Sequence, residues 1–417
     1  MPGIYCMFLA GWSAMGALME RSMNTDLPYF PFQHRNDSLA PECQRLQETQ
    51  PIARVRMDTL EAWLITGYSL AKQALTDDRL SLSLVSRPET PKLPAPGIPI
   101  EALASMDALG RAGLRKAFTS LLTPAHVARA EPRARDIARS LLDRMAGSPQ
   151  PLDLYGHYAQ AFPLALSGHL LGMPLEELQP LAEATETALS LEPRRPIEYQ
   201  RNWESTRDYF VALLERPDLP DGVARRFRDE NAARPAEDRL DAASLADKLV
   251  MVFGSSHLGS ASMLSLSFVT LLHRRDVWEE LRRDPSRTEG VVEECLRFGL
   301  FLPAGLPRVA REDLDLGGVT ISAGELVLIA ADVANRDPAA YPDPGRFDPG
   351  RETKGHLAFG LGPAFCPGSA LARMTMKVAI EELVRRFPAM RLAVPPDRVT
   401  WRDDLIEVRP VEIPVRW

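Results

Sequence analysis

The chain is 417 residues long, with 45% hydrophobic and 25% charged residues and a formal net charge of −7 at pH 7. This composition is typical of a soluble globular protein and excludes a disordered, collagenous or multi-span membrane chain. Lys and Arg do not gather in one block, so a nucleic-acid partner is not expected. The four cysteines share no short spacing, which argues against a disulfide framework or a zinc site and fits a reducing cytoplasm.

The chain opens with an apolar run over residues 4–19 that has no Lys or Arg before it. As a helix this run would span roughly 24 Å, which is short of the ~30 Å hydrocarbon core of a bilayer. It also lacks the basic first region of a secretory signal. We therefore predict no membrane or export role for it. Residues 1–27 are expected to be an extension, either disordered or the product of a start codon assigned too early, and residues 28–417 to form one domain.

The next segments alternate between a proline-rich loop and long helices. Residues 87–99 contain too many prolines for a regular helix and predict a long surface loop. Helical patterns rich in Ala, Leu, Arg and Glu follow at 108–121, 124–146, 175–190, 200–215 and 241–283. The last of these is the most apolar, and such a helix is usually buried.

The last quarter of the chain mixes turns, strands and one helix. Residues 315–333 alternate and turn at glycine, which predicts a β-hairpin. A meander rich in Pro, Gly and Asp fills 335–351, a helix is expected at about 367–387, and short strands close the chain. With no internal repeat and no linker-like boundary, the predicted fold class is mainly α with small β-sheets (α+β).

The strongest local signal is the loop at residues 359–368, Phe-Gly-Leu-Gly-Pro-Ala-Phe-Cys-Pro-Gly. Its glycines allow a tight turn that brings the backbone close to a flat ligand. Backbone N–H groups and the start of the following helix would face Cys366 and favour its thiolate, as an axial iron ligand requires. The alternative is a buried, inert cysteine in a Gly/Pro turn.

Two further groups of residues accompany this loop. Glu294 and Arg297 are spaced i,i+3 and share one face of a helix, where a simple solvated pair would be the plain interpretation. The meander carries Asn-Arg-Asp-Pro at 335–338 and Asp-Pro-Gly-Arg-Phe-Asp-Pro-Gly-Arg at 343–351. In isolation this second group is a polar loop.

In this order and spacing, the three groups together resemble the cytochrome P450 family of haem-thiolate monooxygenases over roughly residues 28–417. The resemblance implies a fold in which haem b lies between a long distal helix and the helix after the cysteine loop, with Cys366 as the iron ligand. Glu294 and Arg297 match the family's ExxR motif, which pairs with an arginine of the meander, here Arg346 or Arg351.

The resemblance also implies the residues that hold the haem. Arginines suit its propionates because guanidinium groups pair with carboxylates through charge-assisted hydrogen bonds. The expected propionate and cysteine-loop residues are Arg111, Arg115, Arg308, His356, Phe359, Gly360 and Gly368. One departure is Ala364, at a position where the family often has His or Arg, so one contact could be supplied elsewhere.

The long apolar helix departs from the family where Ala-Gly-x-Asp/Glu-Thr is usual, since residues 252–260 read Val-Phe-Gly-Ser-Ser-His-Leu-Gly-Ser. In the family this acid and alcohol deliver protons during oxygen activation. One register puts Leu258 and Gly259 at the two positions, the other Ser256 and His257, and neither restores the pair. His257 is the best replacement because imidazole titrates near neutrality, with Ser256 and Ser260 holding a water molecule. The alternative is a core histidine satisfied within the helix.

This departure resembles the phenol- and indole-coupling P450s, and in particular the indolocarbazole-forming enzymes that oxidise chromopyrrolic acid, a bis-indole dicarboxylate. Such a substrate requires cationic groups in the distal pocket. Arg87 and Lys92 of the proline-rich loop, and Arg194 and Arg195 of the 186–200 segment, are the candidates. Taken one at a time, each is more simply interpreted as a surface charge.

The function that follows is oxidative aryl C–C coupling of an aromatic natural product by a cytoplasmic, monomeric enzyme. Electrons would come from a ferredoxin and its reductase, docking on the face of Cys366 near Arg373. Three alternatives stay open: a conventional P450 hydroxylase, a peroxide-driven haem enzyme, and a haem-binding protein without turnover.

Overall fold

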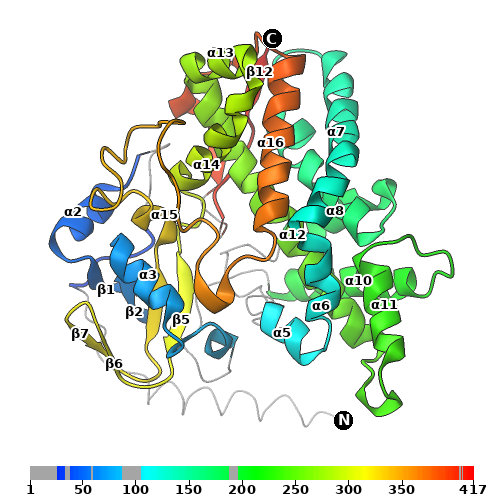
Figure 1. Ribbon diagram of the computed structural model, residues 1–417, viewed down its shortest axis with the longest axis horizontal. Coiled ribbons are helices and arrows are strands. Elements are labelled where there is room, and N and C mark those ends of the chain that lie inside the picture. Colours follow the sequence, from blue (N-terminus) through cyan, green and yellow to red (C-terminus); the bar gives the residue numbers. More distant parts are fainter. Residues whose placement is uncertain are drawn as a thin grey trace, which may run out of the picture.

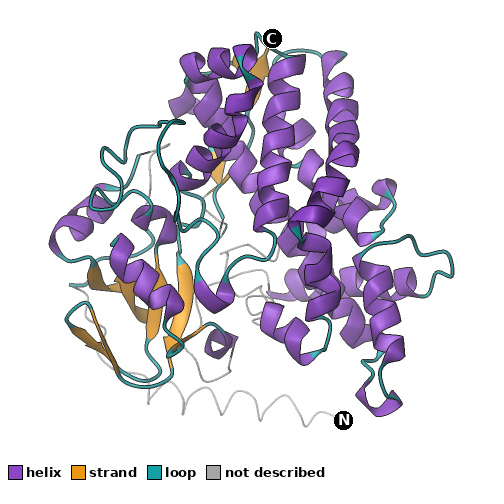
Figure 2. Cartoon of the chain, viewed as in Figure 1, coloured by secondary structure: helices purple, strands orange, loops and turns teal. Residues whose placement is uncertain are grey.

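The computed structural model describes residues 26–32, 38–57, 60–86, 105–186, 196–402, 405 and 407–417. Helices gather in one part of the molecule, and most strands lie beside them in a smaller part (Figures 1 and 2). The fold class is therefore mainly α with small sheets, as predicted. The proposed extension over residues 1–27 lies almost entirely outside the described residues.

The helical part is built from long helices that pack around α12 (Ala242–His273). In Figure 1, α16 (Ser369–Arg386) and α7 (Pro124–Ala146) run side by side in front of it. The other helices of this part are α5 (Ser105–Arg111), α6 (Arg115–Thr119), α8 (Ala161–Leu171), α9 (Leu178–Glu186), α10 (Pro196–Leu214), α11 (Val223–Ala233), α13 (Arg275–Arg283) and α14 (Thr288–Phe298).

Helix α12 is the centre of the apolar core because most of its side chains are buried. It begins at Asp241, whose side chain accepts a hydrogen bond from the backbone N–H of Ser244 (2.7 Å) and so caps the helix. By length and composition it could span a membrane, but 72% of its most apolar window is buried inside the protein. That burial identifies it as a core helix, in agreement with its apolar sequence.

The main sheet has five strands in the order β1-β2-β8-β5-β3. Strands β1 (Ile52–Met57) and β2 (Leu60–Ile65) form an antiparallel hairpin, and β2 pairs in parallel with β8 (Leu326–Ile329). Strand β5 (Leu306–Ala310) lies antiparallel to β8 and to β3 (Leu80–Ser81). Helices α2 (Pro41–Thr49), α3 (Tyr68–Thr76) and α15 (Ala331–Ala334) accompany this sheet.

The prediction of a hairpin at 315–333 is correct only for the first half of this segment. Its first half forms β6 (Leu314–Leu316) and β7 (Val319–Ile321), whereas its second half enters the main sheet as β8. Two further small sheets join distant parts of the chain: β4 (Leu152–Asp153) with β12 (Pro414–Arg416) and β9 (Arg391–Leu392), and β10 (Trp401–Arg402) with β11 (Arg409–Pro410).

Candidate active site

The cysteine loop is a tight, hydrogen-bonded turn between the sheet region and α16. Gly360 and Gly362 have φ values of 68° and 71°, a region that side chains rarely adopt. A Cβ at Gly362 would lie 2.7 Å from the carbonyl oxygen of Leu75, so only glycine fits there. The backbone N–H of Cys366 donates to the carbonyl of Phe359 (2.9 Å) and closes the turn. The loop thereby holds Cys366 just before the first turn of α16.

The surroundings of the Cys366 sulfur act on the pKa of its thiol in opposite directions. Burial raises the pKa of its thiol, while a hydrogen bond from the backbone N–H of Gly368 and the nearby charge of Arg373 lower it. A Cβ at Gly368 would come within 3.8 Å of Sγ, so this glycine lies directly against the sulfur. Backbone donors beside a sulfur stabilise its thiolate, which is the form that binds iron.

Cys366 lines a cavity of about 420 Å³ between the cysteine loop and α12. This volume is within the ~300–1,000 Å³ typical of small-molecule sites. Most of the lining is apolar, and among the described lining residues only Arg308 is charged. On the α12 side the wall consists of Val252, Ser255, Ser256, Gly259, Ser260 and Met263; on the proximal side it includes Phe359, Gly360, Cys366, Gly368 and Met376.

Arg308 on β5 is a buried cation with few partners. It is 4% exposed, and its one hydrogen-bond acceptor among the described residues is the carbonyl of its neighbour Pro307 (2.8 Å). Burial lowers its pKa to about 10, which still leaves it charged at neutral pH. An uncompensated buried charge is costly, so this guanidinium suits an anionic group of a ligand in the cavity.

The other expected propionate residues do not line the described cavity. Arg111 and Arg115 are exposed at the end of α5 and the start of α6. The His356 side chain is buried, and its Nδ1 accepts from the backbone N–H of Ala358 (3.3 Å). Its Nε2 donates to Glu293 (3.0 Å), so both ring nitrogens are already used.

Glu293 was not singled out from the sequence, although it connects this region to α16. It accepts hydrogen bonds from His356 and from Arg373 (Nε–Oε1 2.5 Å). Burial alone would raise its pKa, but these two donors lower it to about 2. The guanidinium of Arg373 also lies 4.6 Å from the ring centre of Phe359. The ion pair of Glu293 and Arg373 therefore supports the cysteine loop through Phe359. The sequence motif pointed to the adjacent Glu294, and no pattern in the sequence pointed to Glu293.

Glu294 and Arg297 form a fully buried ion pair in α14 rather than a solvated one. Arg297 donates to both carboxylate oxygens of Glu294 at 2.7 Å and to the meander carbonyls of Asn335 (3.0 Å) and Pro344 (3.1 Å). Of the two candidate meander arginines, Arg351 lies near Glu294 (Nε–Oε1 3.6 Å). Arg346 instead points its exposed side chain to Asp348. The pair therefore fixes the meander that leads into the cysteine loop.

On the distal side, the structure separates the three predicted proton-handling residues. Ser256 and Ser260 line the cavity, with the Ser256 hydroxyl donating to the carbonyl of Phe253 (2.9 Å). His257 is buried and does not line the described cavity; its Nδ1 donates to the same carbonyl (2.8 Å). Its Nε2 has no partner among the described residues, and burial lowers the pKa of the ring to about 3. The imidazole is therefore neutral at neutral pH.

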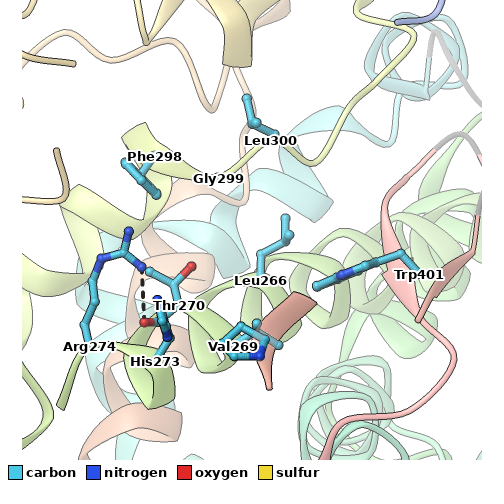
Figure 3. Close-up of a pocket in the computed structure, with 10 residues that line it drawn as sticks. Leu266, Val269, Thr270, His273, Arg274, Phe298, Gly299, Leu300 and Trp401 are labelled. Carbon is cyan, nitrogen blue, oxygen red and sulfur yellow. Dashed lines mark hydrogen bonds between the residues drawn. The ribbon is translucent and has the colours of Figure 1, made fainter. Parts of the chain in front are cut away.

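The four predicted substrate cations, Arg87, Lys92, Arg194 and Arg195, lie outside the described residues. A second hollow, of about 90 Å³, lies on another flank of α12 (Figure 3). It is lined by Leu266, Val269, Thr270, Arg274 and Trp401 among others and shares no described lining residue with the main cavity. Its small size and its separation from Cys366 exclude this hollow, and the cavity lined by Cys366 is the candidate active site.

This geometry fits a haem bound through a thiolate. Cys366 supplies the sulfur at one wall, Arg308 supplies a buried positive charge for a propionate, and the apolar lining suits a macrocycle. The serines of α12 face the same space from the opposite wall.

Comparison with known proteins agrees with this geometry. The sequence model of the Cytochrome P450 family matches residues 230–403. Mycocyclosin synthase of Mycobacterium tuberculosis is 34% identical over 393 residues, which cover 93% of this chain and 98% of that protein. The chain belongs to the cytochrome P450 family. Like its relatives, this P450 is an oxidoreductase that binds haem b through a cysteine thiolate.

Other P450s extend the comparison. Nocardicin C N-oxygenase of Nocardia uniformis is 33% identical over 403 residues, covering 94% of this chain and 99% of the relative. Among solved structures, the putative thioether synthase SgvP has a TM-score of 0.84 at 27% identity and covers 94% of this chain and 100% of its own. Cytochrome P450mel 107F1, described as having biaryl coupling reactivity, has a TM-score of 0.79 at 28% identity, with coverages of 93% and 99%. The predicted family and fold are thus confirmed, and these relatives are enzymes of secondary metabolism.

Proposed function

We propose that this P450 catalyses oxidative aryl C–C coupling of an electron-rich aromatic substrate, using O₂ and electrons from a ferredoxin and its reductase in the cytoplasm. The observation that carries the proposal is the distal wall. Its α12 residues facing the cavity are Val252, Ser255, Ser256, Gly259, Ser260 and Met263, with no carboxylate or threonine among them. The relatives named mycocyclosin synthase and P450mel with biaryl coupling reactivity support it.

The residues of the cavity have distinct roles in this proposal. Cys366 binds the haem iron, and the bound haem supplies the one-electron oxidations. Arg308 pairs with a propionate, and Arg111 and Arg115 remain candidates for holding the haem edge. His356 could do so only by giving up its hydrogen bond to Glu293. The apolar walls bind the aromatic rings and exclude bulk water, which keeps two radical sites together until they join.

In this proposal the serines of α12 take the main role in proton transfer. Ser256 and Ser260 both line the cavity, and in this proposal they hold a water molecule at the distal wall. His257 does not line the described cavity, so it takes part only indirectly, through Nε2, which has no partner among the described residues. It does so in its neutral form because its pKa lies far below neutrality. Ring coupling removes two hydrogens from the substrate without inserting oxygen, while O₂, two electrons and two protons are consumed and two water molecules form. The distal wall must therefore still admit protons, and the serines and a water molecule are the proposed route.

For a bis-indole dicarboxylate such as chromopyrrolic acid, Arg87, Lys92, Arg194 and Arg195 are the proposed carboxylate partners. The test is to incubate the purified holoprotein with ferredoxin, reductase, NAD(P)H and chromopyrrolic acid and to follow the product mass. Loss of hydrogen with ring closure, with or without decarboxylation, supports coupling of this substrate. A gain of one oxygen identifies a conventional hydroxylase instead.

Two controls separate the remaining possibilities. Turnover driven by hydrogen peroxide at the rate of the reductase-driven reaction would favour a peroxide-driven enzyme. Cys366→Ala is expected to abolish the thiolate-type Soret band of the reduced carbonyl complex, whereas Cys43→Ala retains it. An unchanged band in Cys366→Ala would contradict the ligand assignment.

A further inference from the structure

A carboxylate from the C-terminal hairpin approaches α12 at Gly259, where the helix has no side chain. Gly259 lines the cavity, and a Cβ built on it would lie 3.6 Å from Oε1 of Glu407; apart from the neighbouring backbone of α12, no other atom of the described residues comes within 4 Å. Glu407 comes from the turn between β10 and β11, 148 positions along the chain. The missing side chain of Gly259 therefore leaves a small space, the opening at Gly259, with Oε1 of Glu407 at its edge. Glu407 itself is not among the residues that line the cavity.

The two oxygens of Glu407 have different surroundings. Oε2 accepts hydrogen bonds from the hydroxyl of Ser262 (3.1 Å) and from Nη2 of Arg409 (3.3 Å). Oε1, the atom next to Gly259, accepts none from the residues that the structure describes. One oxygen thus holds the side chain in place, and the other retains its capacity to accept a hydrogen bond.

The surrounding charges keep this carboxylate anchored. Arg409 is fully buried; its Nε donates to Ser262 (3.2 Å), and its Nη1 lies 3.6 Å from Glu186 at the end of α9. Arg402 also donates to Glu186 (2.7 Å). Among the described residues this cluster therefore holds two carboxylates and two guanidinium groups, and His257 of α12 is neutral. Removing Glu407 from this set would leave Arg409 with less compensation for its burial.

We propose that Glu407 is a specificity-determining residue whose Oε1 accepts a hydrogen bond from an O–H or N–H group of the substrate through the opening at Gly259. The inference rests on the proposed function, in that the cavity beside Cys366 is the substrate pocket. The substrate is then a phenol or an N–H heteroaromatic compound, and its O–H or N–H group faces α12. A carboxylate of the substrate cannot occupy that position because of charge repulsion, and must face another wall.

Three rigid ligands of one shape test the proposal in the haem-loaded protein: 4-phenylphenol, its methyl ether 4-methoxybiphenyl, and biphenyl-4-carboxylate. Dissociation constants come from calorimetry, with the Soret shift of the ferric protein as a second readout. We expect the phenol to bind about tenfold more tightly than the ether, because hydrogen bonds to charged acceptors are among the stronger ones. The carboxylate should bind most weakly.

Two variants should reduce the preference for the phenol to about threefold or less. Glu407→Gln removes the charge at nearly constant shape and should also strengthen binding of the carboxylate. Gly259→Ala fills the opening while leaving Glu407 and Arg409 intact. Because alanine is the better helix former, Gly259→Ala should also raise the melting temperature, so a loss of preference in it cannot be attributed to unfolding.

Glu186→Gln is the matched control. It removes the other carboxylate next to Arg409 and should leave the ligand preference unchanged. Equal binding of phenol and ether by the wild-type protein, failure of the phenol to bind, or a preference that persists in both Glu407→Gln and Gly259→Ala would each overturn the proposal. A normal ligand preference without any coupled product would instead contradict the proposed reaction and leave the role of Glu407 standing.

Discussion

Arg308 illustrates how a single residue can be unfavourable for folding and favourable for ligand binding. Its guanidinium is buried beside the cavity, with one carbonyl as its hydrogen-bond acceptor in the part of the chain that the structure describes. We expect Arg308→Met to raise the free energy of unfolding of the apoprotein by about 1 kcal/mol, because it removes a poorly compensated buried charge. The same change should weaken haem binding about tenfold, because it removes a charge-assisted pair with a propionate.

Urea denaturation of the apoprotein and haem transfer to apomyoglobin measure the two effects of Arg308→Met. Arg311→Met, on an exposed neighbour, serves as the control and should change neither quantity. A loss of apoprotein stability in Arg308→Met would show that the guanidinium is compensated within the protein itself.

Because His257 is buried in its neutral form, the free energy of unfolding should depend on pH. Its pKa is lowered from 6.5 to about 3 in the folded protein, so below pH 6.5 the unfolded chain binds a proton that the folded protein does not. Stability attributable to this residue is therefore complete above pH 6.5 and is lost as the pH falls, at about 1.4 kcal/mol per pH unit. Between pH 7 and pH 5 this amounts to about 2 kcal/mol.

His257→Gln should remove that part of the pH dependence, as measured by urea denaturation at pH 7 and pH 5. The exposed His157 provides the comparison, and His157→Gln should retain the wild-type slope. If His257→Gln also retained it, the ring would have to be protonated or solvated in the folded state.

At the scale of elements, α14 and the meander depend on one buried ion pair. Glu294→Gln leaves the fully buried Arg297 without its carboxylate, and breaking such a pair costs about 3–5 kcal/mol. We expect this loss in the free energy of unfolding, with impaired haem retention because the meander leads into the cysteine loop. Arg346→Ala removes an exposed side chain that pairs with Asp348 and should change stability by about 0.5 kcal/mol or less. Equal losses in the two variants would contradict this assignment.

Elements with strong local signals were predictable from the sequence. Helix α7 covers the expected residues 124–146, and the cysteine loop and the pair Glu294–Arg297 lie where their local patterns placed them. The apolar pattern over 241–283 hid the break at Arg274, where α12 ends and α13 begins, because both helices are periodic and no proline separates them.

Contacts between distant residues left no such signal. The parallel pairing of β2 with β8 follows from tertiary packing, and no short-range pattern encodes it. The choice between Arg346 and Arg351 also needed the structure, because both residues belong to one polar loop. The approach of Glu407 to Gly259 joins a carboxylate of the last turn to a glycine in the middle of the chain, and neither residue is unusual by itself.

At the scale of the whole molecule, the cavity draws its walls from both parts of the protein. Arg308 belongs to the main sheet, whereas Cys366 and Ser256 belong to the helical part. A ligand that contacts both parts stabilises the folded state by mass action. We expect haem to raise the melting temperature by several degrees, with the Soret band and the far-ultraviolet circular dichroism lost in one transition. Loss of the Soret band well before the helical signal would show that the haem is held by one part alone.

The small side chains along the cavity face of α12 also make this wall the adjustable surface for enzyme engineering. Ser255, Ser256 and Ser260 occupy a continuous helix whose backbone is fixed by its own hydrogen bonds and by burial of its other faces. Larger residues there would narrow the chamber stepwise without moving the thiolate or the meander. A library confined to these three positions should therefore yield catalysts that differ in the size of aromatic they accept while sharing one haem environment.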